Sequence, residues 1–117
     1  MQISIAQQEH VTVVAVAGSI DALTADELVA ALSAQVHAGN TRLVAAFDAV
    51  EYTSSAGLRV LLGTLKQARQ HGGDLRLAAV QERVRRVLEL SGFTSILKCY
   101  PDVASAVASF PGERLPA

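Results

Sequence analysis

Five consecutive apolar residues between Leu43 and Phe47 constrain the fold of this chain more than any other feature. An apolar run without polar alternation predicts a β-strand that is buried on both faces, and we place this strand at residues 42–50. Such strands are typical of largely parallel sheets whose two faces are both covered. The residues that follow, beginning at Ser54, carry a helical pattern, so the strand leads almost directly into a helix.

Strand and helix patterns alternate along the rest of the chain. Residues 3–5 and 11–17 predict an antiparallel hairpin, and residues 74–80 and 96–100 predict two more strands. Helices are expected after the Thr24-Ala25-Asp26-Glu27 capping box, after the serine turn, around Val84–Leu88 and from Pro101, in its first turn, to Phe110. The first of these helices shows Leu28, Val29, Leu32 and Val36 at helical spacing. We therefore expect an α/β fold, with a mixed, mostly parallel sheet of about five strands flanked by about four helices.

Length and composition favour one domain. A chain of 117 residues can bury about two-thirds of its unfolded surface. We expect the domain to occupy residues 1–111 and residues 112–117 to form a disordered tail. The net charge of -1 does not favour nucleic acid, and no apolar run approaches the roughly 20 residues of a membrane-spanning helix. Since the first residues also lack a secretion signal, we expect a cytoplasmic protein without direct membrane insertion.

The common catalytic and metal-binding motifs are missing from the sequence. It contains neither a phosphate-binding glycine loop nor a nucleophile elbow nor a metalloprotease motif. Cys99 is the only cysteine, and the three histidines have no partners at metal-ligand spacing. We therefore expect no enzyme activity, no cofactor and no metal. Arg83, Arg85 and Arg86 fit either a solvated helix face or a surface for a protein partner.

Two serines stand where the second helix is expected to begin. Ser54 or Ser55 can cap the unpaired backbone N–H groups of that helix. The same position also suits a phosphoryl group, because helix N-termini attract anions. Composition and spacing leave both interpretations open.

The segment from Val50 to Val80, "VEYTSSAGLRVLLGTLKQARQHGGDLRLAAV", closely resembles the STAS family, and within it the stand-alone anti-sigma factor antagonists of bacteria. The motifs Gly18-Ser19-Ile20-Asp21 with Thr24-Ala25, and Ser91-Gly92-Phe93, extend the likeness from about Ile3 to Phe110. The resemblance implies a single STAS domain that binds a GHKL-type serine-kinase anti-sigma factor while it is unphosphorylated. Phosphorylation of a serine by that kinase ends the complex, and a PP2C-type phosphatase restores it. The alternative is a STAS scaffold subunit of a membrane transporter, such as a lipid-transport ABC system.

The resemblance also implies specific site residues. It places the phosphoacceptor at Ser55, with Ser54 as the adjacent alternative, and Asp21 beside it in the loop before the first helix. The implied partner-binding residues are Asp21, Thr24, Thr53, Ser54, Ser55, Ala56, Gly57 and Arg59. The chain departs from the family pattern at Ser54 and Ala46, where Asp is frequent, and at Ala56, where a second hydroxyl is common.

Overall fold

The computed structural model describes residues 1–111, and its strands form one sheet in the order β1-β2-β3-β4-β5. The strands are β1 (Gln2–Gln8), β2 (Val11–Ile20), β3 (Arg42–Thr53), β4 (Asp74–Ala78) and β5 (Cys99–Tyr100). Only β1 runs antiparallel to its neighbour within this sheet. The helices are α1 (Ala25–His37), α2 (Ser55–Gln70), α3 (Glu82–Leu90) and α4 (Val103–Ser109). The mixed, mostly parallel α/β fold expected from the sequence is thereby confirmed, whereas the tail expected at 112–117 lies outside the described residues.

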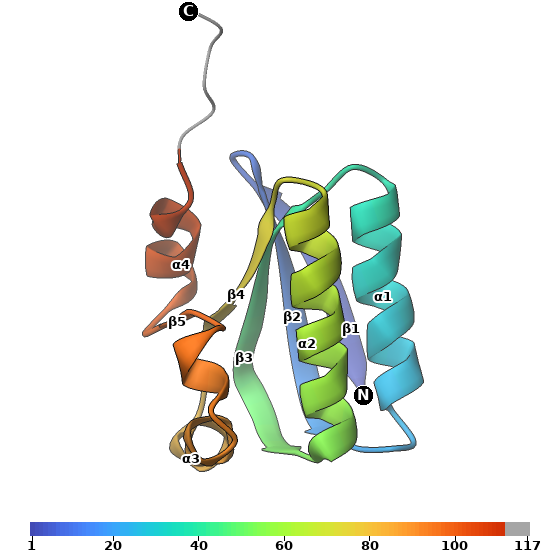
Figure 1. Cartoon of the computed structure of the whole chain (residues 1–117), viewed down its shortest axis with the longest axis vertical. Coiled ribbons are helices and arrows are strands. Elements are labelled where there is room, and N and C mark those ends of the chain that lie inside the picture. The colour runs from blue at the N-terminus through green and yellow to red at the C-terminus, as the bar shows by residue number, and fades with distance from the viewer. Residues whose placement is uncertain (112–117) are drawn as a thin grey trace, which may run out of the picture.

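The first half of the central strand β3, from Leu43 to Phe47, is buried on both faces, as its apolar run predicts. Leu43, Ala45 and Phe47 belong to the larger apolar core, which α1 and α2 cover. Val44 and Ala46 alternate with them and pack in a smaller core beneath α4. Figure 1 shows α1 and α2 side by side over the sheet and α4 beyond β4. Because residues 43–47 supply side chains to two cores, this part of β3 has no face left for water, which explains its continuous apolar run. The second half of the strand differs from the expectation, since Asp48, Ala49, Glu51 and Tyr52 are exposed.

The last third of the chain differs most from the expectation. The strand expected at 96–100 pairs only through Cys99 and Tyr100. Gly92 (φ 76°) leads into a 3-10 turn, η1 (Phe93–Ser95), and the backbone N–H groups of Ile96 and Leu97 donate to the carbonyl of Phe93 instead of joining the sheet. Pro101 does not lie in the first turn of α4, since Asp102 is the residue that caps that helix. The strand expected at 74–80 ends at Ala78, and Ala79 takes a left-handed backbone conformation (φ 57°) that turns the chain toward α3.

One residue of the expected face of α1 is not in the core. Leu28, Leu32 and Val36 are almost completely buried, as their spacing predicts, but the side chain of Val29 is 43% exposed. Val29 lies one residue beyond the buried stripe of α1, on the flank that faces the groove between α1 and α2. The helical spacing of Val29 therefore predicts the helix correctly but wrongly places this side chain in the core.

The parallel strands β2 and β3 bring the loop before α1 and the turn before α2 to the same edge of the sheet. The register of β2 and β3 pairs Ser19 with Tyr52 and Ile20 with Thr53, so both strands end together. The loop before α1 and the turn before α2 therefore lie next to each other (Figure 1). Within residues 1–111, no helix is long and apolar enough to cross a membrane, and no group of three or more His, Cys, Asp or Glu side chains could hold a metal ion.

Candidate functional site

The turn between β3 and α2 has Ser54 as its helix cap. Ser54 has an extended backbone (φ -92°, ψ 178°), and its hydroxyl oxygen accepts a hydrogen bond from the backbone N–H of Ala56 at 3.2 Å. Its carbonyl accepts the first helical hydrogen bond, from Leu58 N–H at 3.1 Å. These contacts satisfy backbone groups that a helix start otherwise leaves unpaired. The capping interpretation is therefore correct for Ser54, and it leaves Ser55 available for another role.

Gly57 holds this turn tightly against the sheet. A Cβ atom added to Gly57 would lie 2.7 Å from Cγ2 of Ile20 and would also collide with Oγ1 of Thr53. Ile20 and Thr53 are 0% and 3% exposed, so neither side chain has space to move away. Only a glycine lets the first turn of α2 approach the ends of β2 and β3 this closely. A further hydrogen bond, from the backbone N–H of Ser54 to the carbonyl of Ile20 at 2.8 Å, fixes the same contact.

Ser55 is the first residue of α2, and its side chain is exposed. Within residues 1–111, its hydroxyl forms no hydrogen bond, whereas the hydroxyls of Ser54 and Thr53 both do. The first turn of α2 contains no acidic residue that would balance the positive end of the helix dipole. The turn thus presents an exposed hydroxyl at a position with favourable electrostatics for an anion.

The loop between β2 and α1 is organised by Asp21. Its carboxylate oxygen Oδ1 accepts hydrogen bonds from the backbone N–H groups of Leu23 (2.9 Å) and Thr24 (3.1 Å). The Thr24 hydroxyl accepts from the N–H of Asp21 at 3.0 Å and donates to the carbonyl of Ser19 at 2.9 Å. The expected capping box at Thr24 is therefore wrong, because this hydroxyl turns back toward β2 and makes no capping bond to α1. Asp21 and Thr24 instead hold the loop in one shape.

The structure separates the predicted partner-binding residues into two groups. Thr53 and Gly57 are buried, so they shape the turn and offer little surface to a partner. Ser55 and Arg59 are exposed, while Asp21, Thr24, Ser54 and Ala56 are partly exposed. All eight lie at the edge of the sheet where β2 and β3 end, or in the first turn of the helices that follow.

Ala46, one of the departures from the family pattern, does not belong to this site. It is 3% exposed in the core beneath α4, and it lies eight residues before Ser54 in the chain, on the order of 20 Å along the strand. An Asp at this position would lie among apolar side chains and not beside the phosphoacceptor. Of the two positions with a missing carboxylate, only Ser54 is part of the turn.

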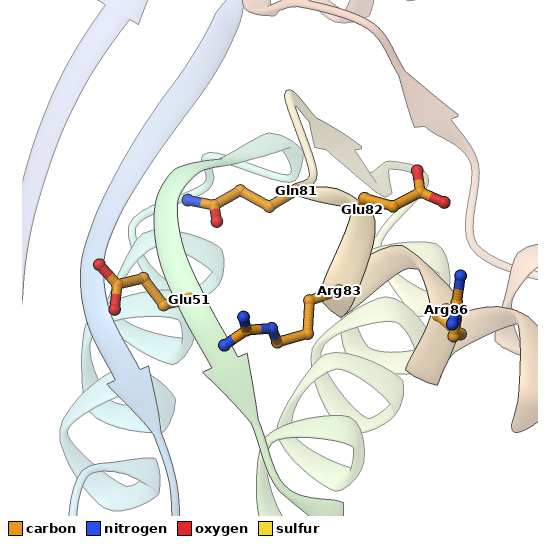
Figure 2. A pocket seen from close by; sticks show the side chains of 5 residues that line it. All are labelled: Glu51, Gln81, Glu82, Arg83 and Arg86. Carbon is orange, nitrogen blue, oxygen red and sulfur yellow. The ribbon is translucent and has the colours of Figure 1, made fainter.

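A charged hollow of about 560 Å³ lies on the other side of β3 and was not predicted from the sequence. Figure 2 shows its lining, with Arg83 of α3 pointing toward Glu51 of β3. Gln81 crosses between the two elements and donates a hydrogen bond to the carbonyl of Asp48 at 2.7 Å. Glu82 and Arg86 complete the lining. Glu51 and α3 are far apart in the sequence, so only the fold reveals that they line one hollow.

Comparisons with known proteins define the family. The family model described as the STAS domain matches residues 2–106, and the chain belongs to this family. It is 36% identical to BtrV of Bordetella bronchiseptica, a protein provisionally named an anti-sigma factor antagonist, over 94% of this chain and 95% of that protein. It is 31% identical to the anti-sigma-B factor antagonist of Bacillus subtilis, over 83% and 88% of the two chains. The crystal structure of an anti-sigma factor antagonist from Mycobacterium paratuberculosis superposes with a TM-score of 0.85 at 30% identity, covering 92% of each chain.

Proposed function

We propose that this chain is an anti-sigma factor antagonist that works by partner switching. In its unphosphorylated form it binds a serine-kinase anti-sigma factor, and phosphorylation of Ser55 ends that complex. The observation that carries the proposal is the exposed, unbonded hydroxyl of Ser55 at the start of α2. Relatives that bear this functional name match the chain over most of its length, which supports the assignment.

The geometry of the turn suits a domain that stays folded in both states. A phosphoryl group on Ser55 adds about 1.5 to 2 negative charges. It meets the positive end of the α2 dipole, and the first turn contains no carboxylate to repel it. The contacts of Gly57 and Ser54 keep the turn fixed against the sheet. Phosphorylation thus changes the charge of the surface more than its shape.

A change of charge is enough to release a partner. In the complex the Ser55 hydroxyl would be enclosed by the anti-sigma factor, and a dianion in its place must be stripped of water. A penalty of about 2.7 kcal/mol corresponds to a hundredfold loss of affinity. The chain itself needs no catalytic group for this role, because a GHKL-type kinase supplies the phosphoryl transfer and a PP2C-type phosphatase the hydrolysis. Both partners would act in the cytoplasm, where the kinase has ATP.

Phosphate mapping tests the proposal. The chain is incubated with ATP and a GHKL-type serine kinase encoded beside its gene, and the product is digested and sequenced by mass spectrometry. We expect one phosphate on Ser55, none on the Ser55→Ala variant, and continued phosphorylation of Ser55 in the Ser54→Ala control. A wild-type chain that binds the kinase but stays unmodified, or that carries its phosphate on Ser54, would contradict the proposed mechanism.

A further inference from the structure

A groove of about 340 Å³ separates the first turns of α1 and α2 next to Ser55. We refer to it as the helix groove, and its lining residues are Ala22, Ala25, Asp26, Val29, Ala56, Arg59 and Val60. The two helices are joined farther along, where the side chain of Gln67 lies 3.4 Å from both Ser33 Oγ and His37 Nε2. They are thus bridged toward their C-terminal ends and leave a hollow at the N-terminal ends, next to Ser55.

The helix groove is lined mostly by small aliphatic residues, with one charge on each wall. Five of its seven lining residues are Ala or Val, while Asp26 extends from α1 and Arg59 from α2. Val29 remains 43% exposed there, and Leu23, which adjoins Ala22 in the loop, is 93% exposed. Exposed aliphatic side chains gathered beside a functional turn are typical of a protein-interaction surface.

We propose that the helix groove receives an aliphatic side chain of the serine-kinase anti-sigma factor. This inference rests on the proposed function. The groove is continuous with the phosphorylation site, since Ala56 follows Ser55 directly and Ala25 follows Thr24. A partner that covers Ser55 would therefore reach Val29 without leaving the surface.

Size and charge favour a protein side chain over a small molecule. The volume lies at the lower end of the range for small-molecule sites, about 300 to 1,000 Å³, and few polar groups converge there to orient a ligand. An aromatic or aliphatic anchor that fills a pocket inside a polar rim is a common arrangement of an interface hot spot. Asp26 and Arg59, with opposite charges on facing walls, favour a partner segment with the complementary order of charges. The charged hollow of Figure 2 differs, since four of its five lining residues are charged.

The contact has a regulatory consequence. A partner held by both Ser55 and the helix groove retains part of its binding surface after phosphorylation, because Val29 is unaffected by the new charge. The groove would then contribute affinity to both states, while Ser55 determines the difference between them. The helix groove would thus supply binding energy, while the neighbouring Ser55 would control the switch.

The test compares two exposed aliphatic side chains. Val29→Glu places a carboxylate in the groove, and Ile5→Glu makes the matched change at β1, where Ile5 is 45% exposed. Affinity of the unphosphorylated chain for the kinase is measured by isothermal titration calorimetry, and thermal melts check that both variants are folded. We expect Val29→Glu to weaken binding by about tenfold or more, Ile5→Glu by less than about twofold, and Val29→Leu to keep near wild-type affinity.

The outcomes separate this inference from the proposed function. If the wild type binds the kinase and is phosphorylated on Ser55, but Val29→Glu binds equally well, the groove inference alone is overturned. Loss of a self-association of the wild type in Val29→Glu, with unchanged kinase binding, would assign the groove to a second copy and also overturn it. If the wild type neither binds the kinase nor is phosphorylated, both proposals fall together.

Discussion

Replacing Gly57 with alanine tests how tightly the turn between β3 and α2 is packed. The new methyl group would lie 2.7 Å from Ile20 Cγ2 and would overlap Thr53, and both of those residues are buried. Overpacking of this kind costs about 1–3 kcal/mol. Alanine recovers up to about 1 kcal/mol of helix propensity. We therefore expect Gly57→Ala to lower the free energy of unfolding by about 1–2 kcal/mol.

Gly63 provides the matched control within the same helix. A Cβ atom added there meets no other atom within 4 Å, and the residue is exposed. Gly63→Ala should therefore raise stability by about 0.5–1 kcal/mol, because it gains helix propensity without a clash. The two substitutions are chemically identical. Opposite signs of the change in unfolding free energy would therefore reflect the contact of residue 57 with Ile20 and Thr53.

Urea denaturation followed by far-UV circular dichroism measures both variants, since the chain has no Trp for fluorescence. For a domain of this size, 1 kcal/mol corresponds to a shift in melting temperature of about 4 °C. Gly57→Ala should melt below the wild type and Gly63→Ala above it. If both variants are stabilised to the same extent, the turn has free space and our explanation of its rigidity is incorrect.

Three further substitutions probe other contacts that stabilise the fold. Ser54→Ala removes the helix cap and should lower the free energy of unfolding by about 1 kcal/mol, whereas Ser54→Asp keeps a capping oxygen and should not. Equal melting temperatures of the wild type and Ser54→Ala would argue against the cap. Arg76→Ala removes an ion pair to Asp74 (2.9 Å) and the stacking of its guanidinium over Phe110 (4.1 Å), and should cost about 2–4 kcal/mol in urea denaturation. Hydrogen bonds from the backbone and hydroxyl of Ser105 lower the pKa of Asp102, so the stability difference between wild type and Asp102→Asn should be complete above the ordinary Asp pKa of about 4. It should vanish as the pH falls through the lower folded pKa, which denaturation at a series of pH values would measure.

The sequence predicts the fold most reliably where several signals agree. The run from Leu43 to Phe47 and the helical spacing of Leu28, Leu32 and Val36 each reflect burial against a specific partner layer. The resemblance to the STAS family rests on other segments, chiefly residues 50–80, and is confirmed by the family match. These apolar patterns result from burial in the core, so they can be recognised from the sequence alone.

The expectations that were wrong depend on competition between neighbouring groups. Thr24 and Glu27 have the spacing of a capping box, but the Asp21 carboxylate already binds the backbone N–H of Thr24. The strand β5 is short because the backbone N–H groups of Ile96 and Leu97 bond back to the carbonyl of Phe93 instead of joining the sheet. In both cases two local solutions fit the sequence, and contacts elsewhere in the fold select one.

The surface features were the hardest to predict. Val29 satisfies the spacing of a core residue, and only the position of α2 shows that it lines a groove. The charged hollow brings Glu51 together with α3, two segments that share no local pattern. By contrast, one of the two serines at the start of α2 was expected to cap the helix, and Ser54 does so, because capping depends on a single turn. The phosphoacceptor at Ser55 stays a prediction.

The affinity of the anti-sigma factor kinase for the chain before and after phosphorylation tests partner switching most directly. The chain is phosphorylated completely on Ser55, purified and titrated into the kinase by calorimetry beside the unmodified chain and the Ser55→Ala variant. We predict that the unmodified and Ser55→Ala chains bind with similar Kd, and that the phosphorylated chain binds about a hundredfold more weakly. Equal affinity of the phosphorylated and unmodified chains would contradict the proposed mechanism.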